Sequence, residues 1–129
     1  MATAAEEFGR AFYDTGPDGE TLIYDVERLW RISSALPVRR VPLTQVEGEL
    51  DCPQWFQTTN PSPRAVALHA RRIYEADLCL PVILSAKGIV MDGVHRIAKA
   101  WLLGQEDIAA VQFARDPEPD HVVWPQSVG

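Results

Sequence analysis

The stretch GIVMDGVHRIAKAWLLG, residues 88–104, decides the fold. Residues 89–91 form a short apolar run that predicts a buried strand, and Asp92-Gly93 ends that strand with a turn. From Val94 onward the apolar positions recur at i, i+3, i+4, i+7 and i+8, a spacing that fits a helix packed on one side. Gly104 stands where a helix C-terminus favours glycine. The predicted order is therefore strand, tight turn and helix.

The residues on either side of this unit extend it into a small sheet. Residues 80–84 predict a strand, and Ser85-Ala86-Lys87-Gly88 has the length and the glycine of a hairpin turn. After the helix, residues 108–113 alternate well enough to form a closing strand. Residues 38–43 predict a further strand, which Pro42 places near an edge of the sheet.

Two more helices are expected outside this sheet. Ser62 can supply an N-cap oxygen and Pro63 loses no needed N–H at the first helical position, so a helix is predicted over residues 62–77. Its expected buried stripe includes Val66, Ala70 and Ile73, which leaves His69 towards water or a partner. An earlier helix is predicted after Asp25, with an apolar face that contains Val26, Leu29, Trp30 and Ser33.

The remaining segments carry weaker signals. Residues 4–13 predict a short helix and residues 20–24 a short strand, with a Gly-Pro-Asp-Gly turn between them. Residues 48–63 predict a loop pinned to the core by Trp55 and Phe56, or alternatively a mobile lid over a substrate. The Pro-punctuated tail after Arg115 is expected to be extended.

Length and composition indicate one folded domain of the α+β class. A chain of 129 residues can build a single core, and 47% hydrophobic residues are too many for a disordered protein. We expect a helical extension over residues 1–37, a compact domain over residues 38–115 and a tail over residues 116–129. Cys52 and Cys79 fit neither a metal motif nor a disulfide framework and are expected to be thiols. We expect a cytoplasmic protein without membrane contact that folds alone or as a homodimer.

Charge narrows the choice of ligand. The net charge of −6 argues against a general binder of duplex DNA, because such affinity comes mainly from lysine and arginine on phosphates. Residues 60–101 nevertheless carry six basic and three acidic side chains. A locally basic stretch in an acidic protein can concentrate one small anion in a cleft. The alternative is chance placement on a solvated surface.

The turn after residues 89–91 is where an anion would bind. A helix N-terminus has unpaired N–H groups and a partial positive charge, and Gly93 permits close approach. Arg96 lies in the first helical turn, where its guanidinium can hold a phosphate through two hydrogen bonds. His95 can donate another when protonated, and Lys99 lies one turn further on. These groups predict a phosphate cradle.

The segments 81–84, 88–100, 103–104 and 108 together resemble the ParB/sulfiredoxin superfamily, whose members share a strand, a Gly-x-x-Arg or Asp-Gly-x-His-Arg turn, an Ala-rich helix and a Leu-Gly stop. The resemblance covers residues 38–113 and implies a small mixed sheet flanked by helices, with nucleotide phosphates at the helix start. It implies that the residues contacting the phosphate are Gly93, Val94, His95 and Arg96. Two further candidates for this contact are Lys87, otherwise a solvated turn residue, and Lys99.

The same resemblance supplies candidates for catalysis. Asp92 resembles the acidic residue before the turn in free-serine kinases of this superfamily, where it would act as a general base or magnesium ligand; its alternative role is a helix N-cap. Glu47 follows the predicted strand 38–43, where those kinases keep a catalytic carboxylate, and His95 is the third candidate. Val94 stands where sulfiredoxin has its cysteine, so sulfinic acid reduction is not expected. His69 and His121 have no partners at metal-ligand spacing, which argues against structural zinc.

Three functions follow from these residues. The first is a stand-alone domain that binds a nucleotide (ATP, ADP or CTP) or a phosphorylated small molecule, with a magnesium-dependent phosphotransferase acting on a small hydroxyl substrate as its enzymatic form. The second is a non-enzymatic nucleotide sensor or protein-interaction module. The third is a ParB-like DNA-binding protein or nuclease, which the acidic charge opposes. A complete partition protein is not expected, because the Gly-Glu-Arg-Arg signature is missing from the turn.

Overall fold

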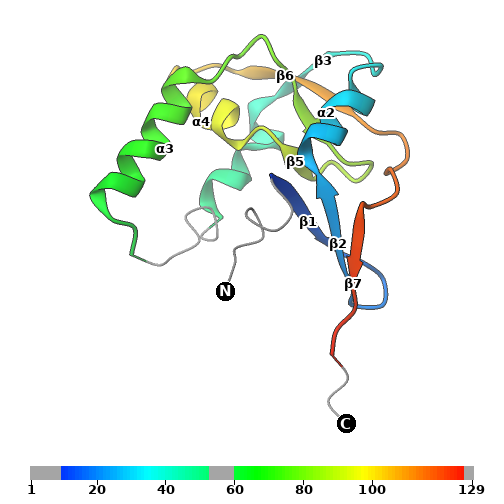
Figure 1. The fold of residues 1–129 in the computed structure, drawn as a ribbon. Helices are drawn as coiled ribbons and strands as arrows, with labels where there is room; N and C mark the ends of the chain where they lie inside the picture. Colours follow the sequence, from blue (N-terminus) through cyan, green and yellow to red (C-terminus); the bar gives the residue numbers. More distant parts are fainter. Residues whose placement is uncertain (1–9, 53–59, 127–129) are drawn as a thin grey trace.

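The computed structural model describes residues 10–52 and 60–126, which form an α+β domain as predicted (Figure 1). Its strands are β1 (Ala11–Thr15), β2 (Thr21–Asp25), β3 (Arg39–Pro42), β4 (Val82–Leu84), β5 (Val90–Asp92), β6 (Asp107–Gln112) and β7 (His121–Val123). Its α-helices are α2 (Val26–Ser33), α3 (Pro63–Glu75) and α4 (Val94–Leu102), and its short 3-10 helices are η1 (Leu43–Gln45) and η2 (Glu47–Asp51). No helix among the described residues is both long and apolar enough to cross a bilayer.

The strands form two sheets. The larger has the order β3-β6-β4-β5, in which β6 runs parallel to β4 and the other neighbours are antiparallel. It is the small mixed sheet that the sequence predicts. The smaller sheet is antiparallel with the order β1-β2-β7, so it joins the two ends of the described chain.

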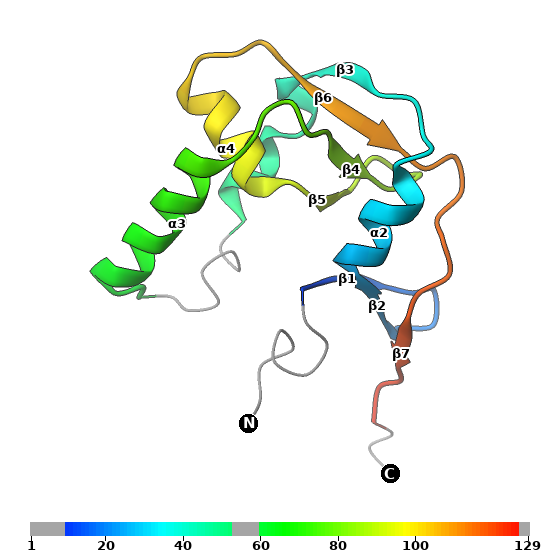
Figure 2. The ribbon, with the colours of Figure 1, turned by 45° about the horizontal axis from the view of Figure 1, so that its top comes forward.

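The core lies on both faces of the larger sheet. Alternate residues of β4 separate to the two sides, so that Val82 and Leu84 pack with Ile97 of α4 on one face while Ile83 packs with Leu29 of α2 on the other. Such alternation follows from the two-residue period of a strand. Figure 2 shows α3 and α4 together on one side of β4 and β5, with α2 on the opposite side.

The helix starts confirm the capping signals in the sequence. The Asp25 carboxylate accepts a hydrogen bond from the Glu27 backbone N–H at the start of α2, and Ser62 Oγ accepts one from the Ala65 backbone N–H at the start of α3. These bonds satisfy backbone donors that a helix leaves unpaired in its first turn. Gly104, with φ 71°, follows the end of α4 as expected.

The predicted helix over residues 4–13 is wrong where the structure describes it, because residues 11–15 form strand β1. This segment contains aromatic residues and a threonine, which favour strands, and it pairs with β2 through a hairpin closed at Gly16 and Gly19. Residues 4–9 lie outside the described residues. Part of the predicted loop 48–63 also forms a 3-10 helix, η2, and the expected anchors Trp55 and Phe56 lie outside the described residues.

The described part of the tail, residues 116–126, is extended as expected, and part of it forms a strand of the smaller sheet. β7 hydrogen-bonds to β2, and the Asp120 carboxylate accepts hydrogen bonds from the Asp25 backbone N–H at 2.7 Å and from Arg28 at 2.6 Å. Partial burial raises the pKa of Asp120, but these two hydrogen bonds, together with the positive charges of Arg28 and His121, outweigh that effect, so the net shift is downward. The tail is therefore attached to the N-terminal hairpin.

Helix α3 does not bury the stripe that its sequence predicts. None of its residues is buried, and Val66 is 46% exposed. The half-buried positions are Ala65, His69 and Ile73, at i, i+4 and i+8, and this face lies towards α4. The expected orientation is wrong because α3 packs on another helix and not on the sheet. His69, expected to face water or a partner, lies on this face and stacks on His95.

Candidate functional site

The predicted turn forms a corner between β5 and α4. Gly93 has φ 122°, which is unfavourable for any residue with a side chain. A Cβ at this position would also lie 2.6 Å from Val82 Cγ1. Glycine is therefore required here by the packing of the corner against β4. This requirement exists whether or not a ligand binds.

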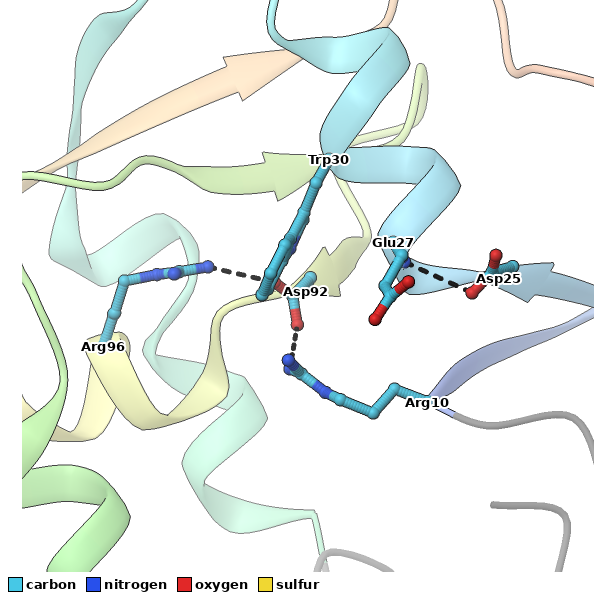
Figure 3. A network of polar contacts seen from close by, with 6 residues as sticks. All are labelled: Arg10, Asp25, Glu27, Trp30, Asp92 and Arg96. Atoms are coloured by element: carbon cyan, nitrogen blue, oxygen red, sulfur yellow. Dashed lines mark hydrogen bonds and ion pairs between the residues drawn. The ribbon is translucent and has the colours of Figure 1, made fainter. Parts of the chain in front are cut away.

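Asp92 is the centre of a polar network at this corner (Figure 3). Its Oδ2 accepts hydrogen bonds from Trp30 Nε1 at 2.6 Å and from Arg96 Nη2 at 3.0 Å, and its Oδ1 accepts one from Arg10 Nη2 at 3.1 Å. The N-cap of α4 is Gly93, and no side chain caps this helix. The N-cap interpretation of Asp92 is therefore wrong. Its carboxylate joins α2, α4 and the residue before β1.

Arg96 is held in this network, and one of its donors is buried without a hydrogen-bond partner among the described residues. Its side chain is 11% exposed and that of Asp92 is 10% exposed, so this is a largely buried ion pair. Arg96 Nε is buried and has no hydrogen-bond partner among the described residues. A buried donor without a partner costs about 1–3 kcal/mol. An acceptor atom on a ligand would remove that cost.

A cleft opens in front of this corner. It consists of two adjoining cavities of about 240 Å³ and 580 Å³, both of which are lined by Arg10, Arg72, Asp92, Gly93 and His95. The smaller cavity also reaches Arg96 and Glu75, and the larger reaches Glu49, His69 and Val94. The cleft thus gathers arginines from three separate parts of the chain, with acidic groups between them.

A pair of histidines connects the two helices beside the cleft. His95 Nε2 lies 3.5 Å from His69 Nδ1, and the rings stack with their centroids 5.7 Å apart. Burial, followed by the positive charges of His69, Arg72 and Arg10, lowers the pKa of His95 to about 4, although Asp92 opposes this shift. Burial and Arg72 also lower the pKa of His69. His95 is thus neutral at pH 7 and offers one N–H, not the two of the protonated ring.

Three sequence-predicted site residues lie elsewhere. Lys99 Nζ donates hydrogen bonds of 2.8 Å to the backbone oxygens of Tyr74 and Ala76, at the C-terminal end of α3. Lys87 is exposed in the turn between β4 and β5 and lines a different cavity. Glu47 lines a groove beside Trp101, also away from the cleft.

The structure adds site residues that the sequence did not single out. Glu49, two residues after Glu47, lines the cleft, and burial raises its pKa. Arg72 and His69 reach the cleft from the same side of α3, and their i, i+3 spacing is the one signal that could have placed them together. Arg10 and Trp30 carry no such signal, because they meet Asp92 from 82 and 62 residues away.

The cleft offers carboxylates but no complete metal cage. Among residues 10–52 and 60–126, no three His, Cys, Asp or Glu side chains gather as a ligand set for a metal ion. Magnesium usually takes one or two protein carboxylates together with phosphate oxygens. The carboxylates that line the cleft are Glu49, Glu75, Asp77 and Asp92. These residues therefore fit a magnesium ion that arrives with a phosphate ligand.

No protein-family model matches the sequence, no curated protein matches it, and no solved structure matches the fold. The resemblance to the ParB/sulfiredoxin superfamily therefore stays a prediction. The function has to be argued from the cleft itself.

Proposed function

We propose that the cleft at the start of α4 binds the phosphate of a nucleotide or of another phosphorylated small molecule. The observation that carries this proposal is Arg96, whose buried Nε lacks a partner among the described residues beside the first turn of α4. A phosphate oxygen would accept from that donor. The first-turn N–H groups of α4 and its dipole also favour an anion at this place.

Arg10 and Arg72 strengthen the case. A guanidinium has five N–H donors, so the hydrogen bond from Arg10 to Asp92 leaves most of its donors available. Arg72 forms no ion pair among the described residues and lines both cavities. Arginines that converge in this way can hold phosphate through paired, charge-assisted hydrogen bonds. The overall charge of −6 still disfavours duplex DNA as the ligand.

Glu49 favours an enzymatic form of this function, a magnesium-dependent phosphotransferase. Both oxygens of Asp92 already accept hydrogen bonds, whereas Glu49 lines the same cavity with a pKa raised by burial. A raised pKa brings a carboxylate closer to the range where it can take a proton from an attacking hydroxyl. Glu49 would receive that proton while the hydroxyl oxygen bonds to the terminal phosphorus of a nucleoside triphosphate. The bond from that phosphorus to the bridging oxygen would break, and the nucleoside diphosphate would leave. Magnesium, held with the phosphate, would stabilise the charge on the transferring group.

The setting we propose is the cytoplasm, where a small domain with two exposed cysteines meets a reducing environment and abundant nucleotides. Without turnover, the same cleft would serve a nucleotide-sensing module. Binding and turnover are therefore measured separately.

Calorimetric titration with ADP, ATP and CTP, with and without magnesium, tests the binding site. Arg72→Ala is expected to weaken nucleotide binding by about tenfold or more, the effect of losing a charge-assisted hydrogen bond. Arg72 is exposed, so the substitution should leave folding intact. Arg71→Ala is the matched control, because it makes the same change at the neighbouring position, which does not line the cleft. Equal affinities for the two variants would contradict the proposed site.

Turnover tests the role of Glu49. Glu49→Gln is expected to lower nucleotide turnover by about a hundredfold, the lower range for loss of a general base, with binding retained. Glu47→Gln, the same change in a different groove, should leave turnover unchanged. Nucleotide binding without turnover in the unmodified protein would assign the cleft to a non-enzymatic module.

A further inference from the structure

A third cavity adjoins the phosphate cleft, and its lining has a different character. It has a volume of about 330 Å³ and lies between the C-terminal half of α2, the segment that follows α2 and strand β4. Trp30 and Arg96 line both this cavity and the cleft, so the two spaces share a wall. The remaining lining is mainly apolar, with Leu36, Val38, Leu80, Pro81, Ile83 and Val111. We call this space the apolar cavity.

Exposed apolar side chains gather around the apolar cavity. Val38 is 60% exposed, Leu80 is 53% exposed and Trp30 is 44% exposed. Isolated exposed hydrophobic residues are ordinary on a protein surface, but three that line one cavity mark a place where a ligand can remove apolar surface from water. Small-molecule sites commonly have this composition, with few polar groups, and volumes from about 300 Å³ upward.

The shared wall is held in place before any ligand arrives. The Trp30 indole N–H donates to Asp92, and the Arg10 guanidinium lies 5.0 Å from the Trp30 ring centroid in a cation–π contact. Leu29, the preceding residue, is fully buried and anchors α2 on the sheet. A flat aromatic surface is therefore fixed within reach of the arginines. Binding next to it requires little ordering of the protein.

We infer that the apolar cavity binds the planar, apolar group of a phosphate ester whose phosphate lies in the cleft, as the base of a nucleotide would. This inference rests on the proposed phosphate site and specifies the ligand class as aromatic phosphate esters. The two spaces lie side by side, because Trp30 and Arg96 line both, and this favours one ligand that reaches across these two side chains. The small volume favours a single ring system over a long acyl chain, and Trp30 offers that ring a stacking partner.

A series of simple phosphate esters tests the inference by calorimetry. Phenyl phosphate is expected to bind about tenfold tighter than methyl phosphate, since burial of one aromatic ring contributes at least that factor. The double variant Val38→Ala/Leu80→Ala should lose most of this advantage while its affinity for methyl phosphate stays the same. Leu103→Ala/Val123→Ala shortens two exposed apolar side chains elsewhere and should keep the full advantage. Both double variants change exposed positions, so they should fold.

Nuclear magnetic resonance locates the ring directly. Phenyl phosphate should shift the backbone amides of Val38 and Ile83, which line only the apolar cavity, whereas methyl phosphate should shift the amides in the first turn of α4 and leave those two in place. Equal affinity for the two esters, with Arg72→Ala weakening both, overturns the inference and leaves the phosphate site standing. Equal affinity for hexyl phosphate and phenyl phosphate overturns the claim of a planar group. If neither ester binds, both proposals fall.

Discussion

Helices α3 and α4 lie side by side and both line the cleft, yet they are held by different means (Figure 2). Helix α4 buries Ile97, Ala98 and Ala100, of which Ile97 and Ala100 pack with residues of the sheet, whereas no residue of α3 is buried. Both sequences have helical periodicity. The difference teaches that helical periodicity predicts a helix but not how much of that helix is buried. Helix α4 packs against the sheet, whereas α3 packs against α4.

The cleft therefore has one firmly anchored wall and one weakly anchored wall. Arg96 and His95 belong to α4, while Arg72 and His69 belong to α3. The links between the two helices include the His69–His95 contact and the hydrogen bonds from Lys99 to the last carbonyls of α3. Segments with few buried contacts open more readily than core elements. Ligand binding should consequently protect α3 from hydrogen exchange more than α4.

The largest expected effect is a difference in stability between truncating a buried residue of α4 and truncating a half-buried residue of α3. Ile97 is fully buried, so Ile97→Ala should lower the free energy of unfolding by about 2–5 kcal/mol, through lost burial and a residual cavity. Ile73→Ala on α3 is the matched change at a half-buried position, and it should cost about 1 kcal/mol. Urea denaturation measures both values. If Ile73→Ala lowers the free energy of unfolding as much as Ile97→Ala, the proposed difference in anchoring between the two helices is wrong.

A smaller effect is expected at the corner that starts α4. Asp92→Asn removes the charge that faces largely buried Arg96, so we expect a loss of about 2 kcal/mol in stability. Asparagine is a good N-cap, but that property does not help here, because Asp92 does not cap the helix. Glu75→Gln alters an exposed carboxylate of α3 in the same cleft and should change stability by less than about 0.5 kcal/mol. Thermal unfolding measures the stability of both variants. An Asp92→Asn variant as stable as the unmodified protein would contradict a stabilising role of the Asp92 network.

The smallest effect concerns pH and the histidine contact between the helices. The pKa of His95 is about 4 in the folded protein and about 6.5 in the unfolded chain, so between these values the unfolded state binds more protons. Stability should therefore fall as pH drops from about 6.5 to 4. The full shift would correspond to about 3 kcal/mol. Because His95 is only half-buried and solvent screens the charges around it, we expect a loss on the order of 1 kcal/mol. His95→Gln should flatten this dependence. His69→Gln should also reduce the slope, because burial and Arg72 lower the pKa of His69 as well.

The features predicted from the sequence depend on short stretches of chain. The strand, turn and helix around Gly93 and the caps at Asp25 and Ser62 rest on neighbours within four residues, and all of them are present in the structure. The network at Asp92 could not be predicted, because two of its donors come from distant segments and carry no local signature. The burial of α3 could not be predicted either, because it depends on which element of the folded protein the helix packs against.

The pairing of β7 with β2 has a consequence for how the chain reaches its native state. The Asp25 backbone N–H meets the Asp120 carboxylate across 95 residues of sequence, so this contact demands one of the longest loop closures in the domain. At a synthesis rate of about 5–20 residues per second, the first hairpin waits on the order of 5–20 s for the strand that completes its sheet. During that interval one edge of β2 has no partner strand and can join a neighbouring nascent chain.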